Sequence, residues 1–436
     1  MRTFIIIWSS QIVSAIGSAM TKFALTIWVW QLTGEVTTIA LFSFFYQLPL
    51  IFVSLFAGVL IDRYHRKYLI ILGDTSAIIC TVFIGLLYAT HSLQIWHLYF
   101  LVALSGCFGH IQNLAYAASI PLMVSKQHYT RASSMSSLVT HASAIISPAL
   151  AGLLYPAIGL LGIIVIDIAT FALAAATIIF LSIPQPPRTK TTNQDSAKIQ
   201  QQLAFGFHYI LSRPSLLAMT IAFSCFWFAH QIGDTIFQPM ILARTGGNTE
   251  VLGVVMTAAG VGGVVGGAFL SIWGGFERRI HGMLLGFIGT GFSKIILGIG
   301  QIPLIWTGTS FCSAFNLPLL FSSSSAIWYV KVAPSIQGRV FAADHAIGMM
   351  IGTVASLIAG PLADRVFEPA MQPGGILAAM FTPVFGDGTG NGIALLYVIT
   401  SICIVLVGIS GYAFRRLRNV EDILPDQDTA VGEGDV

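Results

Sequence analysis

The sequence predicts an all-α polytopic membrane protein, with twelve transmembrane helices arranged as two six-helix repeats. Of its 436 residues, 55% are hydrophobic and only 9% are charged, and the mean hydropathy is +0.82. In a soluble globular protein roughly a quarter of the residues are charged, so most of this chain must lie in lipid. Apolar runs of ~20 residues, the length that crosses a bilayer, recur along the chain. At ~36 residues for each span and its loop, the length accommodates about twelve crossings.

A polar linker separates the apolar segments into two sets of six. The first segment is a full-length span without a cleavage signature, so we interpret it as helix one and not as a removable signal. The linker contains an amphipathic helix, expected over 197–213 on the membrane surface. These features divide the chain into an N-terminal six-helix bundle (1–183), the linker (184–214), a C-terminal six-helix bundle (215–416) and an acidic cytoplasmic tail without fixed structure (417–436). The expected spans are 4–32, 37–61, 68–90, 95–123, 134–157, 159–183, 215–243, 250–274, 279–301, 304–331, 336–363 and 391–414.

The distribution of Lys and Arg predicts that both termini are cytoplasmic. Cytoplasmic loops hold an excess of these cations, and this orientation places most of the 21 there. The cations are scattered over short loops and form no basic face, which argues against nucleic-acid binding. The sequence therefore predicts an integral protein of the plasma membrane, the inner membrane of a bacterium.

The sequence gives no indication of a metal, a cofactor or an enzyme. The glycine-rich run 260–267 imitates a dinucleotide fingerprint, but it lies inside an apolar span, where small residues let helices pack closely. The glycines of 386–392 lack the Lys-Ser/Thr of a phosphate loop, so the sequence predicts no ATP site. No nucleophile and base can be assembled in one layer of the spans. The cysteines are interpreted as buried small hydrophobes, and they are Cys80, Cys107, Cys225, Cys312 and Cys403.

A short motif follows the second span, where Gly58 and Asp62 precede Arg63, Arg66 and Lys67. The glycine permits close helix approach, and the cations can pair with the carboxylate or with lipid phosphates. An ordinary positive-inside loop explains the cations but not the Gly-x-Leu-x-Asp-Arg spacing. In this motif the sequence resembles the major facilitator superfamily, whose signature between helices two and three has the same form.

Further stretches resemble one branch of that superfamily, the macrolide and multidrug exporters of the drug:proton antiporter type. The similarity covers nearly the whole chain, although His65 and Ser147 depart from the family pattern. The resemblance implies the major facilitator fold and alternating access, in which two halves rock about a central site. It also implies that Asp62 closes the cytoplasmic side against the start of span eleven, near Arg339. The stretches are 31–34, 147–152, 167–171, 338–341 and 359–365.

Ionisable residues within spans are costly and are therefore functional candidates. Lys22 and Asp234 lie the same number of residues before the matching Thr-Gly pairs at 33–34 and 245–246. We expect these opposite charges to pair and close the outer gate, with protonation of Asp234 loosening the pair; two unrelated charges that snorkel to the interface are an equal alternative. Asp344 is a proton-coupling candidate.

Three further intramembrane charges are interpreted as structural. Asp74 and Asp167 lie on outer helices of the resembled fold, where we expect them to brace the motif loop and helix packing. Lys294 either snorkels outward or serves structure.

A drug-like substrate needs apolar and aromatic walls with a few polar groups. Candidates on spans that can face the cavity are Trp28, Gln47, His141, Trp227, Gln231 and Asn316. For any one of them, a packing or lipid-facing position is the alternative. A short interfacial helix is expected in the outer segment 367–390.

The sequence thus predicts a monomeric exporter of amphipathic small molecules, driven by proton antiport and in contact with membrane lipids. A lipid or lysolipid flippase of the same fold remains an alternative. A non-transporting membrane receptor or assembly factor is the alternative from another class.

Overall fold

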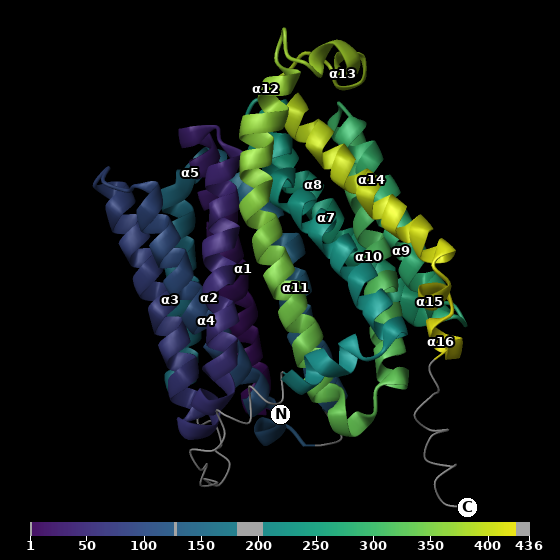
Figure 1. Cartoon of the computed structure of the whole chain (residues 1–436). Helices are drawn as coiled ribbons and strands as arrows, with labels where there is room; N and C mark the ends of the chain where they lie inside the picture. Colours follow the sequence, from purple (N-terminus) through teal and green to yellow (C-terminus); the bar gives the residue numbers. More distant parts are fainter. Residues whose placement is uncertain (1, 126–128, 181–203, 424–436) are drawn as a thin grey trace, which may run out of the picture. The chain divides into compact units, whose positions relative to one another are not determined.

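The computed structural model describes residues 2–125, 129–180 and 204–423, and the described residues form helices and loops without a strand (Figure 1). Eleven of these helices are long and apolar enough to cross a membrane. This agrees with the predicted all-α class. The long helices are α1 (Arg2–Thr33), α2 (Val36–Arg63), α3 (Arg66–Ala89), α4 (Ile95–Met123), α5 (Tyr129–Phe180), α7 (Pro214–Arg244), α8 (Thr249–Trp273), α9 (Arg279–Ile299), α10 (Pro303–Lys331), α11 (Pro334–Leu362) and α14 (Asn391–Ala413).

Helix α5 accounts for the difference between eleven helices and twelve predicted crossings. It contains 52 residues, which corresponds to about 78 Å of helix, more than twice the ~30 Å of bilayer hydrocarbon. The helix is interrupted at Gly159, where φ is 64° and ψ is −170°. A residue with a Cβ rarely adopts this conformation. The break lies where the sequence separates the spans 134–157 and 159–183, so α5 corresponds to two predicted crossings.

The two Thr-Gly pairs that match in sequence have the same φ at the glycine. Gly34 follows α1 and Gly246 follows α7, and both have a φ of 64°. Gly34 N donates a hydrogen bond to Trp30 O, and Gly246 N donates one to Ala243 O. The two glycines thus share a backbone conformation, but the hydrogen bonds differ, because Gly34 bonds to the fourth residue before it and Gly246 to the third.

The helices pack into two compact units. The first contains Met1–Asp195 and Ile241–Thr257, and the second contains Ser196–Met240 and Ala258–Val436. In the first unit, α1 packs closely on α5. Ser147 Oγ on α5 donates a hydrogen bond to Ile16 O (3.0 Å), and Gly17 leaves space for Asp167 and Thr170.

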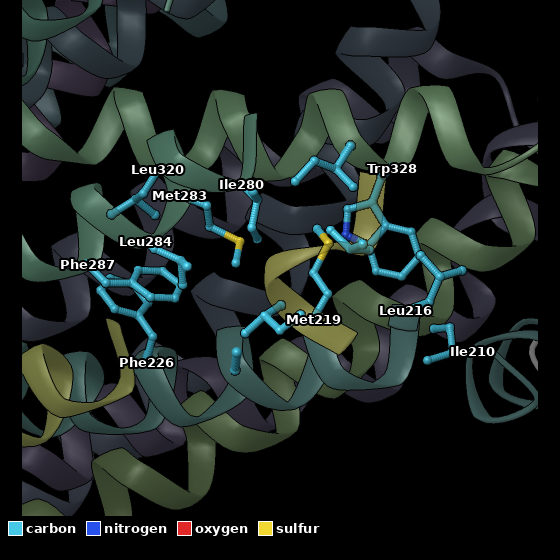
Figure 2. Close-up of a cluster of buried hydrophobic side chains, with 14 of the residues drawn as sticks. Ile210, Leu216, Met219, Phe226, Ile280, Met283, Leu284, Phe287, Leu320 and Trp328 are labelled. Carbon is cyan, nitrogen blue, oxygen red and sulfur yellow. The ribbon is translucent and has the colours of Figure 1, made fainter. Parts of the chain in front are cut away.

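A buried cluster joins α7, α9 and α10 in the second unit (Figure 2). Phe226 of α7 stacks on Phe287 of α9, with ring centroids 4.3 Å apart and an interplanar angle of 11°. Glycines allow the close approach of neighbouring helices, because they present only hydrogen where a side chain would clash. Gly262 and Gly266 of α8 lie against the backbone of α10 at Phe311 and Phe315. The predicted packing role of the glycine-rich run is thus confirmed at these two positions.

Short elements follow α11 in the second unit. The π-helical turn η2 (Ala363–Phe367) and α12 (Glu368–Met371) extend α11, and α13 (Ala378–Phe385) is the short helix predicted in the outer segment. The Glu368 carboxylate accepts hydrogen bonds from Gly390 N (2.8 Å) and Ile393 N (3.2 Å). It therefore caps the N-terminus of α14, where a negative charge is favoured.

The expectation that the tail lacks structure is wrong for its first residues. Helices α15 (Arg415–Arg418) and α16 (Val420–Ile423) continue the chain beyond α14. The Asp422 carboxylate pairs with Arg278 at 3.0 Å, and Glu421 Oε2 accepts a hydrogen bond from Ile280 N at 3.0 Å. These acidic residues cap the start of α9, a tertiary role that tail composition does not reveal. Residues 424–436 lie outside the described part of the chain.

The interpretation of all five cysteines as buried is also wrong. Cys80 is buried and Cys107 is half-buried, whereas Cys225, Cys312 and Cys403 are exposed. An apolar span has a face that packs and a face that lies in lipid, and composition alone does not assign a cysteine to one of them. The three exposed cysteines belong to α7, α10 and α14.

Candidate functional site

The predicted motif loop is the turn between α2 and α3. The backbone of α2 is described to Arg63, but the surroundings of Gly58 and the side chains of Asp62 and Arg63 lie outside the described set. Arg66, in the first turn of α3, donates a hydrogen bond from Nη1 to Ala118 O on α4. This contact ties the beginning of α3 to α4 within the first unit. Lys67 is half-buried beside it.

Arg339, the predicted partner region of the motif aspartate, lies near the start of α11. Its side chain is exposed, and its guanidinium lies 5.6 Å from the ring centroid of Phe205. Residues 204–211 are helical, and Gly206 lies against the Arg339 carbonyl and Ala343. The described end of the predicted amphipathic helix therefore packs on the first turns of α11. The other residues expected in that helix, 197–203, are outside the described part.

Lys22 occupies an exposed position on α1. Its Nζ lies 5.2 Å from the ring centroid of Tyr46 on α2, within the range of a cation–π interaction. Trp28, two turns further along α1, meets Tyr88 edge-on at 6.0 Å. Of the other cavity candidates in this unit, Gln47 is half-buried and His141 is exposed.

Both acidic residues interpreted as structural in the first unit are buried, with 1% of each side chain exposed. Asp74 on α3 accepts a hydrogen bond from Gln112 Nε2 on α4 at 2.5 Å. Asp167 on α5 accepts one from Ser18 Oγ on α1 at 3.3 Å. Each carboxyl thus links two helices of its own unit.

Helix α7 carries a polar stripe in the second unit. Trp227, Gln231 and Asp234 recur at intervals of four and three residues, so they share one face of the helix. Asp234 is exposed, while the other two are half-buried. Trp227 stacks on His230 at 5.7 Å, and Gln231 Nε2 lies 3.3 Å from Ser356 Oγ on α11. The structure therefore brings three sequence candidates together on one helix face.

One interpretation of the sequence was that Lys294 snorkels outward, and this is wrong. The side chain is buried on α9, with 7% exposed. Its Nζ lies 5.7 Å from the ring centroid of Tyr397 on α14, and its charge interacts with that of Asp234. Sequence reasoning did not select Tyr397. A hydroxyl-bearing ring in the middle of an apolar span was the signal that could have identified it.

Asp344 is half-buried on α11 and faces α7 through Thr220, whose Oγ1 donates a long hydrogen bond of 3.5 Å to the carboxylate. The adjacent His345 is exposed, because neighbouring helical positions point about 100° apart. Asn316 on α10 donates from Nδ2 to Cys312 O of its own helix at 2.8 Å and lies against Gly289 of α9. Its amide therefore serves helix packing in this structure.

The described residues contain no group of three His, Cys, Asp or Glu side chains that could hold a metal ion. What the arrangement offers chemically is a small number of charged side chains on long apolar helices, with carboxylates on α7 and α11 and lysines on α9 and α1. Such charges are costly inside a membrane and are therefore functional candidates.

Comparison with known proteins identifies the kind of molecule. The family model described as Major Facilitator Superfamily matches residues 7–345. Macrolide efflux protein A of Streptococcus pyogenes is 23% identical over 366 residues, which cover 83% of this chain and 90% of the relative. Enterobactin exporter EntS of Escherichia coli is 25% identical over 405 residues, which cover 87% of this chain and 84% of the relative.

The solved structures share the fold at low sequence identity. A bacterial homologue of the human lysosomal transporter Spinster, crystallised in an inward-facing and unoccupied conformation, is similar with a TM-score of 0.71 and 14% identity. The match covers 98% of each chain. A bacterial homologue of the iron transporter ferroportin has a TM-score of 0.67 and 12% identity, over 94% of this chain and 97% of that one. At these identities the likeness describes the fold alone.

Proposed function

The chain belongs to the major facilitator superfamily, and from this premise we propose that it exports amphipathic small molecules in exchange for protons. Its relatives are membrane transporters rather than enzymes, and several are efflux proteins. The observation that carries the proton step is the pair of carboxyls on unit-two helices, Asp234 on α7 and Asp344 on α11. A carboxyl inside a membrane span is costly unless it serves transport or is structurally paired.

The substrate class is proposed from the stripe on α7. Trp227 offers an apolar aromatic surface, and Gln231 and Asp234 add polar groups on the same helix face. An amphipathic molecule with an aromatic body fits such a surface. Trp28, Gln47 and His141 are proposed to contribute from the first unit. Asn316 is proposed to contribute less, since its amide is held by its own helix.

The motif residues are proposed to control the cytoplasmic side. Asp62 would close it against the start of α11, near Arg339, because a carboxylate is favoured at a helix N-terminus. Arg66, which is anchored to α4, would hold α3 while Arg63 and Lys67 contact lipid phosphates. Asp74 and Asp167 are proposed to be structural, since each joins two helices within the first unit. Both termini are proposed to lie in the cytoplasm of a bacterial inner membrane, with the protein acting as a monomer.

Lys22 and Asp234 are proposed to pair when the outer gate closes. Lys22→Asp or Asp234→Lys alone should lower export by about 10-fold or more, because each places two like charges in one gate. The double reversal should restore part of the rate. Export is measured as dye efflux from cells that contain equal amounts of each variant in the membrane. A double variant as inactive as the worse single one would remove the gate.

The proposed function is tested with purified protein in liposomes under an imposed pH gradient. Rhodamine 6G, ethidium and a fluorescent lysolipid serve as probes. We expect the dye cations to accumulate against their gradient, with accumulation abolished when a protonophore collapses the pH difference. Lysolipid movement that needs no pH gradient would instead identify a flippase. No movement of any probe would favour a receptor or assembly factor.

A further inference from the structure

Four titratable side chains meet inside the second unit, on three helices. Asp234 and His230 lie one turn apart on α7, Lys294 lies on α9, and Tyr397 lies on α14. Lys294 is 7% exposed and Tyr397 is 2% exposed, whereas Asp234 is exposed. The lysine and the tyrosine are therefore fixed inside the unit, and the carboxylate is the member of the cluster that protons or other cations can reach.

The packing of α7 on α9 explains why these residues meet. The two helices are separated by one intervening span, α8, and therefore run in the same direction. Phe226 and Phe287 stack at 4.3 Å and fix the register of the pair (Figure 2). Two turns further along α7 comes Asp234, and two turns further along α9 comes Lys294. The same contact that packs the aromatic rings thus brings the opposite charges to the same level.

Tyr397 closes the cluster from α14. Its ring packs against Gly233 and Phe237 of α7, and against Gly298 of α9. Lys294 Nζ lies 5.7 Å from the ring centroid, so the ring face stabilises the ammonium group. Because Gly233 and Gly298 lack side chains, Tyr397 can reach between α7 and α9. This places it beside both charged residues, and its hydroxyl interacts with the Asp234 charge.

The charges of this cluster require each other. A buried ammonium group without compensation is strongly destabilising in a membrane protein. Asp234 supplies the opposite charge to Lys294, and Lys294 in turn acts on His230. His230 Nδ1 is buried and makes no hydrogen bond to a described residue. The remaining charged or imidazole side chains in the described parts of the helices around Asp234 lie near helix ends or on the N-terminal half of α11. They are Glu250, Arg244, Arg278, Arg279, His281, Lys331, Arg339, Asp344 and His345.

No direct ion pair joins Asp234 and Lys294 in the described part of the chain. The two charges therefore interact without direct contact. A separated pair of this kind is suited to a switch, because proton binding at the exposed carboxylate removes the attraction without breaking a packed contact.

We propose that Lys294 is a positioning residue for Asp234. Its ammonium group compensates the charge of the Asp234 carboxylate across the α7–α9 contact. A proton that binds to Asp234 removes this attraction, and its release restores the attraction. The second unit thereby contains a complete charge switch of its own. This inference deepens the proposed proton coupling at Asp234 and rests on it, while the attraction itself is measurable without transport.

The attraction is tested by a thermal double-mutant cycle on the purified full chain. Asp234→Asn, Lys294→Gln and the double variant are compared with the wild type at about pH 8. We expect the double variant to lose fewer degrees than the sum of the single losses, because each single variant leaves one charge without its counterpart. Lys331→Gln is the matched control: Lys331 is equally buried in the same unit, at 4%, and donates to Glu421 O, so its loss should add to that of Asp234→Asn.

The switch itself is tested by the pH profile of transport. Lys294→Gln removes the cation that favours the carboxylate form, so a proton should bind at a lower proton concentration and the half-maximal pH should move at least about one unit upward. Lys294→Arg keeps the charge and should restore the wild-type profile, which a purely structural lysine would not require. Additive thermal losses in the double-mutant cycle, or an unchanged profile in Lys294→Gln, would overturn the proposal. A wild-type protein that moves no probe would remove the proposed function, and the thermal cycle would still decide whether the two charges interact.

Discussion

Asp344→Asn is expected to lower proton-driven export by about 100-fold or more, the effect of removing a group that transfers protons. Asparagine has nearly the same shape as aspartate, and its side-chain oxygen can still accept the hydrogen bond from Thr220 that is 3.5 Å long in the wild type. The substitution therefore preserves the contact between α7 and α11 but removes the site that binds and releases a proton. Accumulation of rhodamine 6G in liposomes under a pH gradient measures this loss.

Two further measurements separate coupling from folding in this variant. Exchange of dye across liposomes at equal pH needs no net proton movement, so it should persist in Asp344→Asn. Asp167→Asn is the matched control, because Asp167 is a buried carboxyl that accepts a hydroxyl hydrogen bond between two helices, and its export should stay near that of the wild type. Wild-type accumulation by Asp344→Asn would exclude Asp344 from the coupling step.

Composition and apolar length were sufficient to predict the helices, because a span in lipid must satisfy its own backbone hydrogen bonds. The prediction extended to the boundary near Gly159, where a positive φ interrupts the 52-residue α5. It also covered the packing of Gly262 and Gly266, since a glycine run inside a span has one common use. These features depend on local sequence and on the properties of the bilayer.

The features that sequence did not predict depend on which helix faces which. Lys294 was expected to snorkel outward or serve structure, yet it is buried beside Tyr397, because α9 turns that face toward α7 and α14. In the same way, the acidic residues Glu421 and Asp422 indicated a tail without structure, whereas they cap α9 at Arg278 and Ile280. A single sequence records the period of a helix but not the identity of its neighbours.

Gly286→Leu is expected to have the largest effect on folding, because α9 and α10 are in close contact at this residue. Gly282, Gly286 and Gly289 recur on one face of α9, and a Cβ at Gly286 would lie 2.6 Å from Leu320 Cβ and 3.1 Å from its Cα. Backbone atoms cannot move aside as a flexible side chain can. A leucine would separate the helices along the buried cluster of the second unit and cost about 3 kcal/mol or more.

The measurements are the thermal midpoint of the purified protein and its yield from the membrane. Gly308→Leu on α10 is the matched control, because a Cβ there meets no described neighbour within 4 Å, and it should keep the wild-type midpoint. Gly286→Ala should lie between the two, since it adds the clashing Cβ without the rest of the side chain. A wild-type midpoint for Gly286→Leu would mean that α9 and α10 can separate at little cost.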